Sequence, residues 1–132
     1  MSYQEEKEAI SNVLGRYAQV LNAAESALIP EFYSEDGLFI PDSMNVVYKR
    51  SDLKALGNTY LKESGFKIEY AIQNINIDER YAFVEALAKT SNRGALKQNN
   101  INKTSIDLFI LKRTDAGWKI YRYIFNNVKQ VS

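Results

Sequence analysis

The most informative stretch of this chain is Trp118-Lys119-Ile120-Tyr121-Arg122-Tyr123-Ile124-Phe125. In a strand, successive side chains point to opposite faces, and here both faces carry large apolar groups. One face would hold Trp118, Ile120, Arg122 and Ile124, and the other Lys119, Tyr121, Tyr123 and Phe125. A sheet with one face in water shows one apolar and one polar face. The segment therefore predicts a sheet covered on both sides, by helices on one side and by a second subunit on the other.

The same period of two recurs along the second half of the chain. It predicts four long strands at Phe66–Ile77, Arg80–Ser91, Thr104–Arg113 and Trp118–Asn126. The connections are a tight turn, a longer loop and a hairpin turn, at Ile77–Arg80, Ser91–Lys103 and Thr114–Gly117. Short connections between successive strands favour an antiparallel meander.

The first half of the chain predicts helices. Ser2 and Glu5 fit a capping box, and a stripe of apolar residues follows at helical spacing: Ile10, Val13, Leu14, Tyr17, Val20 and Leu21. A second helix is expected at Ser26–Tyr33, with Leu28 inward and Pro30 in the first turn, where proline is tolerated. A third is expected from a Ser51 cap to about Ser64, ended by Gly65 in a left-handed conformation.

Between the helices we expect a turn and two short strands, at Ser34–Gly37, Leu38–Ile40 and Val46–Tyr48. Helices followed by an antiparallel meander indicate the α+β class rather than a parallel sheet. A length of 132 residues fits a single domain, residues 1–132.

Composition excludes several functions. The net charge of +1 comes from 17 basic and 16 acidic side chains, which argues against a nucleic-acid or anionic-membrane partner. The chain has no cysteine and no histidine, so the commonest metal ligands and the commonest general base are missing. We expect no metal and no cofactor. The polar N-terminus and the lack of any apolar run near about 20 residues predict a cytoplasmic protein.

This order of elements resembles the nuclear transport factor 2-like superfamily, in particular its SnoaL-like and ketosteroid-isomerase-like branches. The resemblance runs from about Gln4 to Asn126. It is carried by Arg16-Tyr17, Phe32-Tyr33-Ser34-Glu35-Asp36-Gly37, Tyr81-Ala82-Phe83-Val84 and Phe109–Ile120. It implies N-terminal helices packed in the concave face of a curved, mainly antiparallel sheet, with an apolar pocket inside the resulting cone and a homodimer through the outer sheet face. It does not settle function, because the same fold serves enzymes and binding modules.

Tyr17 and Asp107 are the leading candidates for chemistry. By resemblance, Tyr17 matches the tyrosine that donates to the enolate oxygen in ketosteroid isomerases, and Asp107 lies near a second donor, a protonated carboxyl group. Asp107 stands between apolar neighbours, so it must be paired or have a raised pKa. The alternatives are a core tyrosine for Tyr17, and for Asp107 an ion pair with Arg80, Arg122 or Lys103.

The general base of that reaction has no clean counterpart. Counting from Tyr17, its aspartate falls on Pro41, and Asp42 is one residue away. A shift of one residue in a strand turns the side chain to the other face, so Asp42 serves as a base only if the chain bulges there. The alternative is a turn residue.

We expect a small apolar molecule in the pocket. The candidate ligand-binding residues are Tyr17, Phe32, Phe39, Tyr60, Phe83, Glu85, Phe109 and Arg122. For Glu85 and Arg122 the alternative is pairing within the sheet. The sequence thus favours a homodimeric ligand-binding module and does not establish turnover. The alternatives are a cofactor-independent isomerase or cyclase acting on a small carbonyl compound, and a structural dimerisation domain.

Overall fold

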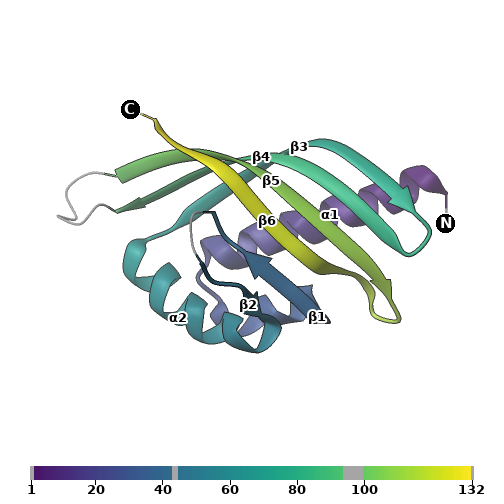
Figure 1. The fold of residues 1–132 in the computed structure, drawn as a ribbon, viewed down its shortest axis with the longest axis horizontal. Helices are drawn as coiled ribbons and strands as arrows, with labels where there is room; N and C mark the ends of the chain where they lie inside the picture. Colours follow the sequence, from purple (N-terminus) through teal and green to yellow (C-terminus); the bar gives the residue numbers. More distant parts are fainter. Residues whose placement is uncertain (1, 43–44, 94–99, 132) are drawn as a thin grey trace.

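Six strands form one curved sheet, with the helices on its concave side (Figure 1). The computed structural model describes residues 2–42, 45–93 and 100–131. The strands are β1 Tyr33–Ile40, β2 Tyr48–Lys49, β3 Lys67–Asp78, β4 Tyr81–Arg93, β5 Asn100–Thr114 and β6 Gly117–Val131. Their order is β2-β1-β6-β5-β4-β3, and all neighbours are antiparallel except β1 and β6. The predicted α+β class with a mainly antiparallel sheet is confirmed.

Helix α1 (Tyr3–Asn22) begins as predicted. The Ser2 hydroxyl accepts from the Glu5 N–H at 3.1 Å, and the Ser2 N–H donates to the Glu5 carboxylate at 3.2 Å. Its predicted apolar stripe is buried against the sheet. Near its start, Glu6 accepts from the Arg113 guanidinium at 3.1 Å and from the Trp118 indole at 3.0 Å. These bonds tie the N-terminal end of α1 to the β5–β6 hairpin.

Helix α2 (Leu53–Ser64) ends at Gly65, whose φ of 64° is the predicted left-handed conformation. Its start differs from the prediction: the short 3-10 helix η2 (Arg50–Asp52) runs directly into it, and Ser51 is not the cap. The Asp52 carboxylate instead accepts from the Lys49 N–H at 2.9 Å. Within the part of the chain that the structure describes, no helix is long and apolar enough to cross a membrane.

The segment before β1 also corrects a prediction. Residues Ser26–Phe32 form a 3-10 helix, η1, rather than an α-helix, and Pro30 lies in its last turn. The tighter winding turns Leu28 outward, so that it is 38% exposed. The Pro30 carbonyl accepts from the Tyr33 N–H and from Arg50 at 2.8 Å.

The predicted turn at 34–37 is wrong, because these residues lie inside β1. Tyr33 pairs with Ile120 and Leu38 with Arg122, so β1 uses more residues than β6 over the same span. The excess forms a bulge, in which the Ser34 hydroxyl donates to Asp36 at 2.8 Å. The turn-forming residues are thus used to bend a strand. The predicted strand at 46–48 reduces to β2, Tyr48–Lys49.

Strand β6 contains a bulge that the alternating pattern of residues 118–125 did not reveal. Ile110 and Leu111 are adjacent on β5, but their partners are Arg122 and Ile120, which leaves Tyr121 as an extra residue. Trp118 and Ile120 before the bulge, and Tyr123 after it, are all buried. Strict alternation therefore assigns the wrong faces: the bulge joins Ile120 and Tyr123 on the inner face and turns Arg122 outward.

The outer sheet face still carries apolar side chains. Phe83, Leu87 and Ile106 are 39%, 47% and 48% exposed, while α1 and α2 both lie on the other side of the sheet (Figure 1). Large contiguous exposed apolar surfaces often mark interaction sites. The predicted second subunit on this face stays a prediction.

Candidate functional site

A cavity of about 680 Å³ lies between α2, the end of α1 and the inner face of the sheet. This volume is within the range of about 300–1,000 Å³ that is usual for small-molecule sites. Most of its wall is apolar, and this part consists of Leu21, Ile29, Phe39, Tyr48, Leu53, Leu56, Leu61, Phe66, Ile68, Phe125 and Val128. The wall therefore suits an apolar body.

Two local features shape the sheet side of the cavity. The inner residues of β4 beside Asp107 and Ser105 are Ala86 and Ala88, and these small side chains leave room for the cavity next to the two polar groups. A second bulge in β6 lies at Asn127, where φ is 55°. It brings Val128 and Gln130 onto the cavity wall, which extends the cavity along the C-terminal part of β6.

A hydrogen-bonded chain of polar side chains crosses the sheet wall. Tyr123 donates to Asp107 Oδ2 at 2.6 Å, and Ser105 donates to Asp107 Oδ1 at 2.6 Å. The Tyr70 hydroxyl lies 2.8 Å from that of Tyr123; because the Tyr123 proton points to Asp107, Tyr70 is the donor to Tyr123. All four side chains line the cavity, so a ligand can join this chain.

Asp107 is 1% exposed. Burial raises the pKa of this carboxyl group above its ordinary value, and the hydrogen bonds from Ser105 and Tyr123 act in the opposite direction. The alternative, an ion pair of Asp107 with Arg80, Arg122 or Lys103, is absent among the described residues, whose ion pairs are Lys112–Asp36 and Arg113–Glu6. Asp107 is thus held by neutral hydroxyl donors, which leaves the carboxyl group able to accept or donate toward a ligand.

Tyr17 contributes a further hydroxyl group. It lies 2.7 Å from the Tyr33 hydroxyl, and its ring makes edge contacts with Phe109 and Tyr123, with centroids 6.4 and 6.1 Å apart. Burial raises the pKa of Tyr17, so its hydroxyl keeps the proton and can donate. Tyr17 lines the cavity whereas Tyr33 lies behind it.

Five of the predicted site residues meet at this cavity, namely Tyr17, Phe39, Asp42, Tyr60 and Asp107. Asp42 is a turn residue just after β1. Phe32 and Phe109 form a second layer: the Phe32 ring lies 5.5 Å from the Tyr17 ring, and the fully buried Phe109 stacks on Tyr123 at 4.1 Å. These two support the wall rather than forming its surface.

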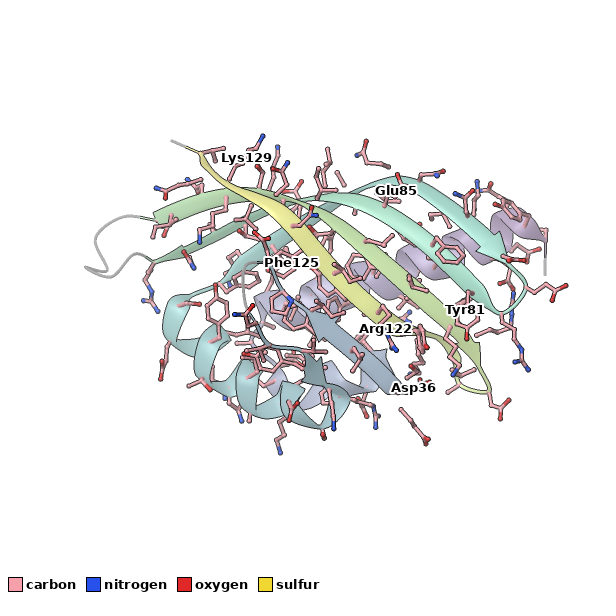
Figure 2. The ribbon with its side chains drawn as sticks, in the orientation of Figure 1. Asp36, Tyr81, Glu85, Arg122, Phe125 and Lys129 are labelled. Atoms are coloured by element: carbon pink, nitrogen blue, oxygen red, sulfur yellow. The ribbon has the colours of Figure 1, made fainter. Side chains whose placement is uncertain are left out.

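Three of the predicted ligand contacts do not line the cavity, because their side chains lie on the outer side of the sheet. Phe83 and Glu85 are exposed on the outer face, because the alternation of β4 turns Val84 inward instead. The β6 bulge turns the Arg122 side chain outward. Its guanidinium group donates to the Asp36 carbonyl at 2.9 Å and lies 3.8 Å from the Tyr121 ring centroid. Figure 2 shows Glu85 on the side of the sheet away from α2, and Arg122 beside Asp36.

Several residues of the cavity wall were not predicted from the sequence. The main hydrogen bonds of the wall come from Tyr70, Tyr123 and Ser105. Their residue types gave little evidence of a binding role in the sequence, because buried tyrosine and serine are common in cores. Lys103 was assigned to a loop, but β5 begins at Asn100 and so includes it. Its inward position follows from alternation with Ser105 and Asp107 once the strand start is known.

No protein-family model matches the sequence, and no curated protein matches it. Solved structures do match the fold. An ntf2-like protein with a cystatin-like fold from Novosphingobium aromaticivorans aligns with a TM-score of 0.81 at 17% identity, over 93% of this chain and 82% of that one. A putative scytalone dehydratase from the same organism gives 0.82 at 16% identity, over 98% and 86%.

A ketosteroid isomerase-like protein from Erwinia carotovora atroseptica aligns with a TM-score of 0.79 at 18% identity, over 98% of this chain and 99% of that one. Identities this low show a shared fold and leave activity open. Because these structures cover nearly the whole chain, the resemblance expected from the sequence holds at the level of fold. The chain has the cystatin-like fold of the nuclear transport factor 2-like proteins.

Proposed function

We propose that this single-domain protein binds a small, largely apolar molecule bearing a hydrogen-bonding oxygen, and that it does so as a homodimer. The observation that carries the proposal is the 680 Å³ cavity, whose apolar wall is interrupted by the Asp107–Tyr123–Tyr70 chain. Burial of an apolar body supplies affinity of about 25 cal/mol per Å² before the costs of ordering are subtracted. The cytoplasmic location expected from the sequence stays a prediction.

The polar chain gives the ligand its orientation. Each Asp107 oxygen accepts one hydrogen bond, from Ser105 or from Tyr123, and a purely apolar ligand would leave the remaining hydrogen-bonding capacity of the carboxyl group unused in the filled cavity. A hydrogen bond to water that is lost and not replaced costs a buried polar group up to about 1–3 kcal/mol. A ligand oxygen that hydrogen bonds to Asp107 or Tyr17 avoids this cost, which favours alcohols, phenols and ketones over hydrocarbons.

Native mass spectrometry tests the binding function directly. We expect the purified protein to carry a small molecule as added mass, or to gain one from a mixture of apolar alcohols and ketones. Leu56 lines the cavity from α2, so Leu56→Trp, which fills part of the space, should lose the added mass while keeping the fold. Equal occupancy of the wild type and Leu56→Trp would place the ligand elsewhere and refute the proposal.

The homodimer is proposed from the outer sheet face. We expect Ile106→Lys to shift the protein from dimer to monomer at micromolar concentration in light scattering. The change replaces one exposed apolar side chain of the outer face with a charge beside the two others, Phe83 and Leu87. The control is Lys129→Gln, also on an exposed position but outside this apolar group. A wild-type protein that is monomeric would remove the dimer from the proposal and leave the cavity function standing.

A second candidate is proton transfer on a small carbonyl compound, favoured by one observation: Asp42, Tyr17 and Asp107 line the same cavity. Asp42 would act as the base, and Tyr17 with a protonated Asp107 would donate to the developing enolate oxygen. Exchange of a bound ketone's α-hydrogen for deuterium, present in the wild type and lost in Asp42→Asn, separates this enzyme from a binding module.

A further inference from the structure

We infer that the ligand is a monoanion with an apolar body about 10 Å long. Its anionic group lies at Lys103 and its hydrogen-bonding oxygen lies at Asp107. This inference rests on the proposed function, since it names the chemical class of ligand for the same cavity.

Lys103 is part of the cavity wall. It lies on β5 at the same face as Ser105 and Asp107, and its partners across the sheet are Thr90 on β4 and Gln130 on β6. Both partners also line the cavity. Lys103 is therefore at the centre of a polar end, flanked by a hydroxyl and an amide that can add hydrogen bonds to an anion.

The Lys103 amine has no ion-pair partner in the part of the chain that the structure describes. The side chain is half-buried, which makes a charged partner more valuable than it is at an exposed site. The cavity wall has two acids, Asp107 and Asp42. Asp42 follows β1, which is separated from β5 by β6, a distance of about 9–10 Å between strands. Asp107 is four residues away from Lys103 along β5. Neither acid is therefore placed to compete with an anion for the Lys103 amine.

The spacing along β5 sets the length of the ligand. Lys103 and Asp107 are four residues apart on one strand, so their Cα atoms are separated by about 13 Å. The side chains reach into the cavity from both positions, which leaves about 10 Å for a ligand that contacts both ends. Two fused rings or a chain of about ten carbons fill this distance, and Phe66, Ile68, Phe125 and Val128 supply apolar wall.

The orientation follows from charge. Asp107 is almost completely buried whereas Lys103 is half-buried, so Lys103 lies nearer to water. An anionic group beside Lys103 keeps part of its hydration, while the same group beside Asp107 would be desolvated next to an acid. The anion therefore belongs at the Lys103 end and the neutral oxygen at the Asp107 end.

The experiment compares matched probes by titration calorimetry. One pair is rigid, 6-hydroxy-2-naphthoate and 6-hydroxy-2-naphthamide, and one is flexible, 10-hydroxydecanoate and 10-hydroxydecanamide. In each pair the carboxylate and the amide have similar size and differ in charge. We expect the wild type to prefer the carboxylate, and Lys103→Gln to weaken its binding about tenfold, or about 1.4 kcal/mol. Binding of the amide should change less than about twofold, since it makes no charged contact at Lys103.

Two variants control for charge and fold. Lys103→Arg keeps the cation and should keep the preference for the carboxylate. Lys129→Gln removes the same charge from β6, next to Gln130 but at an exposed outward position near the C-terminal end of the strand (Figure 2). This variant should change the affinity for neither ligand. Equal weakening by Lys129→Gln and Lys103→Gln would show a long-range charge effect and overturn the inference.

The remaining outcomes separate the inference from the proposed function. If both members of a pair bind the wild type and Lys103→Gln equally well, the anionic class is wrong and the cavity function stands. If no probe binds, the inferred ligand class is wrong; if a probe binds and Leu56→Trp leaves its binding unchanged, the cavity function itself is wrong. Thermal unfolding of each variant, followed by circular dichroism, identifies any loss of binding that comes from a loss of fold.

Discussion

Phe109→Ala is expected to lower the free energy of unfolding by about 3–5 kcal/mol, the cost of truncating a fully buried phenylalanine. Phe109 is 0% exposed. Its ring stacks on Tyr123 at 4.1 Å and meets the edges of the Tyr70 and Tyr17 rings at 5.2 and 6.4 Å. The substitution therefore removes the apolar layer behind the cavity wall. Urea denaturation followed by circular dichroism measures the loss.

Phe83→Ala is the matched control, because it truncates the same residue type on the neighbouring strand. Phe83 pairs with Ile110, one residue from Phe109, but points to the outer face and is 39% exposed. We expect a loss of about 1 kcal/mol or less, at a concentration where light scattering gives both variants the same oligomeric state. Similar losses for the two variants would contradict the assignment of inner and outer faces.

The second large effect is a dependence of stability on pH that Asp107→Asn should abolish. Burial raises the pKa of Asp107 above its ordinary value of 3.8. Below that value the carboxyl group is protonated in both the folded and the unfolded chain, so its stabilising contribution is complete. As the pH rises through the raised pKa, the unfolded chain releases the proton first and the free energy of unfolding falls. Each unit by which the pKa is raised contributes about 1.36 kcal/mol.

Urea denaturation of the wild type and Asp107→Asn between about pH 4 and pH 8 tests this. The asparagine keeps an oxygen for the Tyr123 hydroxyl, and the Ser105 hydroxyl can rotate to accept from the amide. We expect the variant to lack the fall and to be at least as stable as the wild type at the upper end. Parallel curves for the two proteins would show that Asp107 is ionised throughout.

Other carboxylates do not imitate this effect. Hydrogen bonding from Arg113 lowers the pKa of Glu6 below its ordinary value of 4.5, and hydrogen bonds from Ser34 and Lys112 lower that of Asp36 below 3.8. A lowered pKa gives stability that is present above the ordinary value and is lost as the pH falls through the folded value. Their contributions thus change at the acid end, whereas that of Asp107 changes as the pH rises.

Much of the site could not be read from the chain because it depends on register. Asp107 was identified from its apolar neighbours on one strand, which is local information. Its partner Tyr123 is 16 residues away and reaches it only because the bulge at Tyr121 returns Tyr123 to the inner face. Phe83 and Glu85 were assigned to the pocket because alternation shows that two faces exist and not which one turns inward.

Local sequence is enough to specify the capping box of α1, the left-handed Gly65, the long antiparallel strands and hence the α+β class. These features depend on residues close together in the chain, where spacing and backbone preference are sufficient. Three properties arise only in the folded chain: which strand faces form the cavity, that the cavity stays open beside Ala86 and Ala88, and that Lys103 and Asp107 share its wall. Those properties depend on bulges, on strand register and on the volumes of side chains that meet from distant parts of the chain.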